Sequence, residues 1–272
     1  MQLDKTRIAI RERSFPDILD LSLHVIRRHA LALAATFTAG ALPLAIFNHW
    51  FLSEYLNEFD SDGLPPFEYF YMLLLLLIWE LPLAAAPTTL YLGQALFNEQ
   101  PSAGKLCKEL LASLPQLILF QVVLRGVLSL APVTWWVLFW VWPYLNEIIL
   151  LERNPWRKRG PYGSSTATRS SNMHARNRGE LFGRWLGSLL IGAALIAALV
   201  AAAWFLRRQL AYEMAFDKTM YAVYIQAAIW IALGYFAVVR FLSYLDLRIR
   251  TEGWEVELIM RAEAARLTRQ LA

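Results

Sequence analysis

Long apolar segments that alternate with charged segments are the main pattern of this chain. A helix rises about 1.5 Å per residue, so roughly twenty apolar residues cross the hydrocarbon core of a bilayer. The segments that meet this length are residues 30–51, 67–97, 114–131, 133–151, 185–206 and 219–242. The fold class we predict is therefore all-α, a polytopic membrane helix bundle with about six transmembrane helices.

Two of these apolar segments are irregular. Residues 67–97 exceed the length of one span and contain Glu80, Pro82 and Pro87. One tilted, kinked helix is the simplest interpretation, and a helix broken in its middle is the alternative. Residues 114–151 are long enough for two spans, which we place as a tight hairpin that turns at Pro132.

Glycines within the spans predict bends and contacts. Gly40 and Pro43 predict a kink in the first span, because glycine and proline both weaken a helix interior. Gly187 and Gly192 stand near alanines in the fifth span, and Gly183 lies just before it. Such small residues allow two membrane helices to approach closely, so we predict that they pack against a neighbour.

Both ends of the chain predict amphipathic helices. Ser14 is a candidate N-cap, with Pro16 in the first turn and Asp17 three residues after the cap. The apolar residues that follow fall on one helical face, which favours a helix lying on the membrane surface over a cytosolic extension of the first span. Residues 245–272 predict a charged C-terminal helix.

The resulting organisation has five parts. They are an amphipathic N-terminal segment (1–29), transmembrane helices one to four (30–151), a flexible basic loop (152–184), transmembrane helices five and six (185–244) and a cytoplasmic C-terminal helix (245–272).

Charge distribution sets the predicted orientation. The chain is 57% hydrophobic and 18% charged, with a net charge of +4. Lysine and arginine accumulate in cytoplasmic segments of membrane proteins. With a cytoplasmic N-terminus, the predicted inside segments hold 21 of them and the outside segments hold 3. We therefore predict a multi-pass protein of the inner (plasma) membrane with both termini in the cytoplasm.

The basic segments also predict partners. Cytoplasmic lysines and arginines attract anionic lipids, and the amphipathic ends suit membrane or cytoplasmic protein partners. Nucleic acid is excluded as a partner, because the sequence has no zinc-finger spacing, no RNP-type motif and no folded basic domain.

Glu80 and Arg125 are the candidate intramembrane polar pair. Both fall near the middle of predicted spans, where a charge is costly and normally faces the bundle interior or a water-filled cavity. A direct ion pair would join two helices, and a substrate or proton site is the functional alternative.

A second set of charges predicts a polar cluster at the cytoplasmic face. Glu147 lies near the cytoplasmic end of the fourth span, and the members that follow the sixth span are Asp246, Arg248, Arg250 and Glu252. The alternating signs of these last four predict salt bridges to the basic loop, and a solvated helix face is the alternative.

No motif predicts catalysis or a bound metal. The four histidines have no metal-site spacing, and the phosphate-binding and hydrolase motifs that we sought do not occur. The one cysteine, Cys107, is interpreted as an ordinary thiol. We predict that the chain is not an enzyme and has no cofactor.

Three short segments resemble a bacterial family of six-helix membrane proteins. They are the predicted surface helix at 17–28, Leu-Gly-Gln-Ala-Leu-Phe at 92–97, and Tyr-Leu-Asp-Leu-Arg-Ile-Arg-Thr-Glu-Gly-Trp at 244–254. The family is similar to the membrane domain of glycerophosphodiester phosphodiesterases. The resemblance implies a six-helix bundle with no cofactor and no assigned catalytic residue. The catalytic barrel of those enzymes is absent here, so their activity is not implied.

These observations favour a non-enzymatic scaffold or accessory subunit of a cell-envelope system. The alternative is a transporter or permease subunit that uses the region of Glu80 and Arg125. A membrane enzyme acting on lipid is a third hypothesis, which would require clustered acidic or histidine side chains at an interface.

Overall fold

The computed structural model describes residues 13–57, 64–96, 101–130, 134, 142–155, 165–175, 177–212 and 216–252, and within them it is helical without strands. The elements in chain order are α1 (Phe15–Arg28), α2 (Ala30–Ser53), η2 (Glu54–Leu56), α3 (Phe67–Ala95), α4 (Ala103–Leu117), η3 (Ile118–Leu124), α5 (Arg125–Ser129), α7 (Leu145–Glu147), η5 (Ile148–Glu152), α8 (Thr166–Ala175), α9 (Arg178–Ala211), η6 (Met220–Ile225) and α10 (Gln226–Glu252).

Five segments of the described residues are long and apolar enough to cross a membrane. They are Ala30–Leu56, Phe67–Ala95, Ala103–Leu128, Arg178–Leu210 and Met220–Glu252. The predicted all-α membrane helix bundle is thereby confirmed as a fold class. Helix α9 shows the membrane character most directly, since large apolar side chains such as Leu189 and Leu190 are exposed along it.

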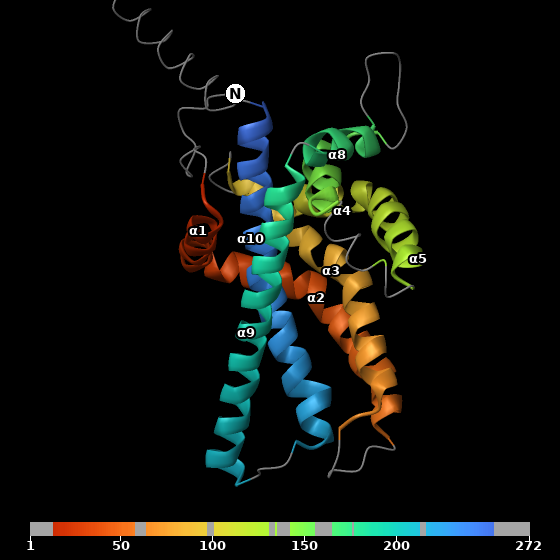
Figure 1. Ribbon diagram of the computed structural model, residues 1–272, viewed down its shortest axis with the longest axis vertical. Coiled ribbons are helices and arrows are strands. Elements are labelled where there is room, and N and C mark those ends of the chain that lie inside the picture. Colours follow the sequence, from red (N-terminus) through yellow and green to blue (C-terminus); the bar gives the residue numbers. More distant parts are fainter. Residues whose placement is uncertain are drawn as a thin grey trace, which may run out of the picture.

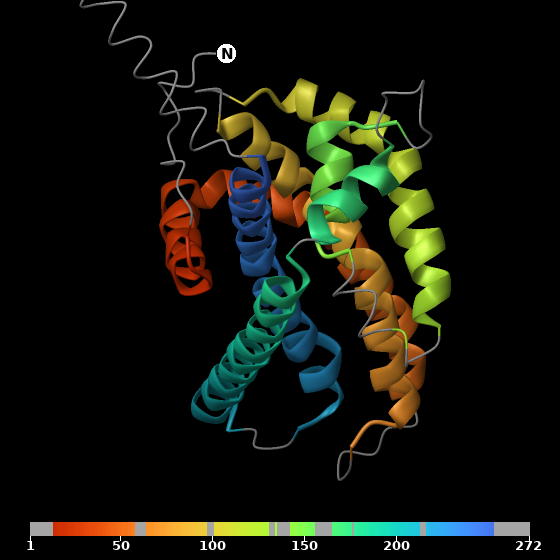
Figure 2. The ribbon, with the colours of Figure 1, turned by 45° about the horizontal axis from the view of Figure 1, so that its top comes forward.

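The long helices form two hairpins around a shared centre. Helices α2 and α3 pair with each other, and α9 pairs with α10; both hairpins extend to the lower part of Figures 1 and 2. Helices α1 and α8 and the C-terminal turns of α10 lie in the upper part of both views. In Figure 2, α4 lies across the top and α5 descends from it.

The α2–α3 pair is the most extensive helix contact. Gly40 of α2 faces the backbone of Ala84 in α3, so closely that a Cβ on Gly40 would overlap the Ala84 carbonyl oxygen. Helix α3 continues through Pro82 and Pro87 without interruption. The prediction of one helix is confirmed over its described part, and the broken-helix alternative is wrong there. The predicted kink stays a prediction.

Helix α10 is the centre of the described fold. It packs against α1, α2, α3, α8 and α9. Its buried side chains include Phe241 and Tyr244, both fully shielded from solvent. Phe241 joins an apolar cluster with Ile18 of α1 and Leu92 of α3. Because α10 contacts all these helices, charged side chains on it can reach partners on several of them.

Several predicted boundaries differ from the structure. The segment 152–184 is not a continuous loop, because α8 and the first two turns of α9 lie within it. The boundary at residue 244 falls inside α10, which continues unbroken to Glu252. Charged residues end a sequence-based span prediction, but a helix whose charges find partners continues through them.

The third and fourth predicted spans are described in part. The third begins earlier than predicted, since α4 starts at Ala103 and runs into η3 and α5. The fourth is helical at 145–152, while residues 131–133 and 135–141 lie outside the described residues. The hairpin turn at Pro132 and the C-terminal helix beyond Glu252 lie outside them too, so both stay predictions.

Candidate functional site

The N-terminal helix α1 is positioned by a capping box and an apolar face. Ser14 Oγ accepts a hydrogen bond from the backbone N–H of Asp17 at 3.4 Å, and the Ser14 N–H donates to Asp17 Oδ2 at 3.2 Å. The predicted cap is therefore confirmed. Ile18, Ser22 and Val25 are buried on the face that packs against the bundle. Helix α1 thus lies fixed along α10.

Asp246 of α10 is the centre of the first charged cluster. Its Oδ1 accepts the backbone N–H of Arg13 at 2.8 Å, and its Oδ2 forms ion pairs with Arg250, at 3.1 Å from Nε, and with Arg184 of α9. Arg250 also donates to the carbonyl oxygen of Arg13 at 2.6 Å. Glu180 of α9 binds Arg184 at 2.6 Å and Arg250 at 3.1 Å. This Asp246 cluster joins the N-terminal segment, α9 and α10.

Glu152 of η5 is the centre of the second charged cluster. Arg169 of α8 binds it through two nitrogens at 2.7 and 3.0 Å, and the Tyr244 hydroxyl donates to it at 2.9 Å. Glu252 accepts from both Arg169 and Arg248, the latter at 2.9 Å. This Glu152 cluster joins η5, α8 and α10.

The charge state of Glu152 follows from these contacts. Burial alone would raise the pKa of this carboxyl, but hydrogen bonds from Arg169 and Tyr244, together with the positive charges of Arg169 and Arg248, hold the pKa below its usual value. Nearby in α8, burial lowers the pKa of His174 to about 4, although the hydrogen bond with Ser170 would by itself raise the pKa. At neutral pH, Glu152 is therefore anionic and His174 is uncharged.

Glu147 and Arg240 form a third group, deeper in the bundle. Arg240 Nε lies 3.1 Å from Glu147 Oε1, and Arg240 Nη2 donates to the carbonyl oxygen of Pro143 at 2.6 Å. Glu147 is 2% exposed and the Arg240 side chain is 20% exposed, so the carboxylate is buried between the helices and the guanidinium is partly buried. Arg125 is buried within electrostatic range of both side chains and donates to Gln121 at 3.1 Å.

The five residues predicted as one polar cluster are divided among these groups. Asp246 and Arg250 belong to the first, Arg248 and Glu252 to the second, and Glu147 to the third. Predicted salt bridges to the segment 152–184 exist between Glu252 and Arg169 and between Asp246 and Arg184.

Several partners in these three groups are not among the predicted site residues. They are Glu152, Arg169, Glu180, Arg184 and Arg240. For Arg240 the sequence does offer an indication, because it is a charged residue within the sixth predicted span. A membrane helix normally tolerates a charged side chain there only when it is paired.

Glu80 has a partner of its own. Its Oε2 accepts a hydrogen bond from Asn48 Nδ2 of α2 at 2.6 Å, and both side chains are buried. Arg125 by contrast lies near Glu147 and Arg240. The structure gives the two residues different neighbours, and their direct pairing stays a prediction.

A double-mutant cycle separates these arrangements. Glu80→Gln and Arg125→Gln change different contacts, so their effects on the free energy of unfolding are expected to add within about 0.5 kcal/mol. Thermal unfolding of both single variants and the double variant, in detergent, provides the measurement. A coupling energy above about 1 kcal/mol would instead support a direct Glu80–Arg125 pair.

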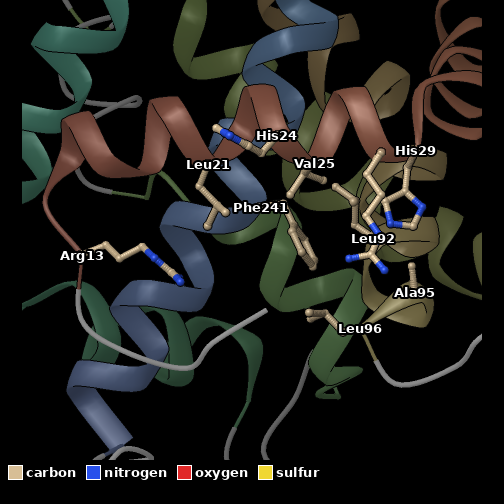
Figure 3. A pocket seen from close by; sticks show the side chains of 10 residues that line it. Arg13, Leu21, His24, Val25, His29, Leu92, Ala95, Leu96 and Phe241 are labelled. Carbon is tan, nitrogen blue, oxygen red and sulfur yellow. The ribbon is translucent and has the colours of Figure 1, made fainter. Parts of the chain in front are cut away.

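A pocket of about 180 Å³ lies between α1, the C-terminal end of α3 and α10. Its lining combines basic or histidine residues with apolar ones, and comprises Arg13, Leu21, His24, Val25, Arg28, His29, Leu92, Ala95, Leu96 and Phe241. Figure 3 shows Arg13 at one end, His29 at the other and Phe241 between them. His29 is held by the hydroxyl of Tyr91, 3.1 Å from its Nδ1.

No family model, curated protein or solved structure matches this chain. The resemblance to the membrane domain of glycerophosphodiester phosphodiesterases therefore stays a prediction.

Proposed function

We propose that this chain is a non-enzymatic integral membrane protein that serves as a scaffold or accessory subunit of a cell-envelope system. In this proposal it lies in the inner (plasma) membrane with both termini in the cytoplasm. The part of the chain proposed to bind a partner protein is the cap, which we define as α1, η5, α8, the first two turns of α9 and the last three turns of α10.

The observation that carries the proposal is the pairing of charges within the cap. Asp246 and Glu152 each bind arginines from another element, and Glu252 joins Arg169 to Arg248. A carboxylate held by arginine, with a lowered pKa as at Glu152, is a weak general base. The same bonds fix the relative positions of four elements, and a preorganised surface reduces the entropic cost of binding a partner.

Charge also supports the proposed orientation. Apart from η5, which lies at the end of the fourth predicted span, the segments that build the cap belong to the predicted inside segments. These hold 21 lysines and arginines against 3 in the predicted outside segments. The positive-inside rule places such segments in the cytoplasm.

Partner capture tests the proposal. The full chain would be crosslinked in cells through photoreactive residues on α8 and then purified in lipid nanodiscs. Wild type is expected to yield a reproducible crosslinked protein. Glu152→Gln is expected to lower that yield about fivefold or more, if losing one charge-assisted contact releases α8. Glu68→Gln alters an exposed carboxylate outside the cap and is expected to preserve the yield.

Two results would refute the scaffold proposal. One is the absence of any protein crosslinked to α8 when the chain is expressed at its normal level. The other is a partner retained at full yield by Glu152→Gln when hydrogen exchange shows that α8 has been released.

A transporter is the second candidate, supported by the polar contact between α2 and α3. Asn48 Oδ1 is buried without a hydrogen-bond partner among the described residues, beside the Glu80 carboxyl. An unsatisfied buried acceptor is costly and is a common feature of ion or substrate sites. Proton or solute flux in reconstituted vesicles, abolished by Glu80→Gln, would favour this function over the scaffold.

A further inference from the structure

The pocket beneath α1 has the chemistry of a headgroup site. Arg13, His24, Arg28 and His29 contribute nitrogen-bearing side chains to its lining, and none of the described residues that line it is a carboxylate. Oxyanions bind such groups through charge-assisted hydrogen bonds. Arg28 is exposed and has no ion-pair partner within the described part of the chain, so its guanidinium is available to a ligand.

The remainder of the lining is apolar. Leu92 comes from α3 and Leu96 follows directly as its C-cap residue, while Phe241 comes from α10 and Leu21 and Val25 come from α1. A soluble phosphate gains nothing from such a wall, whereas the glycerol and first methylenes of a lipid would bury apolar surface against it. At about 180 Å³ the pocket is smaller than a typical site for a whole drug-sized ligand. It suits one part of a larger molecule whose remainder lies outside.

The surroundings of the pocket indicate where that remainder lies. Leu23 on α1 is 56% exposed, and Leu31 at the start of α2 is 88% exposed. Apolar side chains on the outer side of an amphipathic helix contact lipid at the membrane interface. The pocket therefore lies where basic side chains, an apolar wall and the bilayer surface meet.

We propose that the pocket formed by α1, α3 and α10 binds the phosphate headgroup of an anionic phospholipid. Arg28 and His29 hold the phosphate at one end, and the upper part of one acyl chain lies against Leu92, Leu96 and Phe241. Basic pockets between membrane helices are a recurrent means of recognising anionic headgroups. This site is independent of the proposed scaffold role, because it concerns lipid and not a protein partner.

The position of Arg13 gives the site a link to the cap. Its backbone N–H is bound by Asp246 and its carbonyl oxygen by Arg250. The Asp246 cluster thus holds one end of the pocket in place, and lipid binding is expected to stabilise α1 on α10.

The test uses the full chain in a neutral detergent and measures its melting temperature and lipid affinity. Phosphatidylglycerol and diphosphatidylglycerol are the probes, phosphatidylcholine is the zwitterionic comparison, and inorganic phosphate tests the headgroup alone. Anionic lipids are expected to raise the melting temperature, while phosphatidylcholine and inorganic phosphate leave it unchanged. Arg28→Gln is expected to weaken anionic-lipid binding about tenfold, the loss of one charge-assisted hydrogen bond.

Arg27→Gln is the matched control. Arg27 is the exposed neighbour of Arg28 and does not line the pocket. It is expected to change the affinity less than about twofold, as for an exposed surface charge. A third variant, Ala95→Leu, fills the apolar wall and is expected to weaken lipid binding without removing a charge.

Three results would overturn the proposal. Equal losses of lipid affinity for Arg27→Gln and Arg28→Gln would show that anionic lipid is attracted to the basic surface in general and not to the pocket. Equal stabilisation by phosphatidylcholine would show that the headgroup charge is not recognised. Stabilisation by inorganic phosphate, to the same extent as by lipid, would show a site for the free anion. Without lipid, Arg27→Gln and Arg28→Gln should retain the wild-type melting temperature, which separates lost binding from lost folding. The effect of lipid on Ala95→Leu is measured against the melting temperature of the same variant without lipid, because Ala95 belongs to the buried core.

Discussion

Replacing Asp246 by Ala is expected to lower the free energy of unfolding by about 3–5 kcal/mol, the usual cost of removing one member of a buried ion pair. Asp246 is 3% exposed, and the substitution leaves the buried guanidinium of Arg184 without its inner partner. Glu180 still binds Arg184 from the outer side, which places the expected loss in the lower part of this range. The backbone of Arg13 also loses its acceptor, so α1 is released along with α9.

Thermal unfolding of the full chain in detergent, followed by tryptophan fluorescence, measures this loss. Asp20→Ala is the control, since Asp20 is an exposed carboxylate of α1 whose interaction with His24 is a surface contact of 3.8 Å. The control is expected to stay within about 0.5 kcal/mol of wild type. Equal losses of unfolding free energy for the two variants would contradict a stabilising role of the Asp246 cluster.

Replacing Gly40 by Leu is expected to have the largest effect of any single glycine substitution considered. A side chain at this position meets the Ala84 carbonyl group, and the nearest atoms belong to backbone that cannot rotate away. Helices α2 and α3 would have to separate over their central contact. Overpacking of a well-packed interior typically costs about 1–3 kcal/mol, and a clash with backbone is expected to reach or exceed the upper value.

Gly183→Leu is the matched control in α9. Among the described residues, no atom outside the adjoining backbone of α9 lies within 4 Å of a Cβ built on Gly183, so the leucine would project into open space. Size-exclusion profiles and melting temperatures should therefore be disturbed for Gly40→Leu and preserved for Gly183→Leu. Wild-type behaviour of Gly40→Leu would show that α2 and α3 do not approach as closely as the structure indicates.

The two glycines illustrate what the sequence could not reveal. Gly40 was predicted to kink its helix, and in the structure it is a site of close helix contact. Gly183 was predicted to pack, and it faces no neighbour among the described residues, whereas Gly187 contacts Phe15 and Gly192 contacts Phe236. A glycine indicates that close approach is permitted, but only the positions of the other helices decide whether it occurs.

Features determined by nearby residues were predicted well. The capping box of Ser14 and Asp17 involves residues three apart, and the buried face of α1 follows from helical periodicity. The single helix α3 follows from the length of one apolar run, despite two prolines.

Features that depend on distant partners were predicted only in outline. Alternating charges after residue 242 indicated a polar cluster, but not that α10 continues through it. Arg169 and Glu252 are 83 residues apart, and Arg13 and Asp246 are 233 apart. No local pattern encodes such pairs, so the division of the cluster into three groups required the structure.

The central claim is that two separate charged clusters hold α1 and α8 in place against α10, and hydrogen–deuterium exchange tests it most directly. The full chain would be compared in lipid nanodiscs as wild type, Asp246→Asn and Glu152→Gln. Slow exchange throughout α1 and α8 is predicted for wild type. Asp246→Asn should accelerate exchange in α1 and leave α8 protected, whereas Glu152→Gln should accelerate exchange in α8 and leave α1 protected. Rapid exchange of both helices in wild type, or identical patterns in the two variants, would contradict the claim.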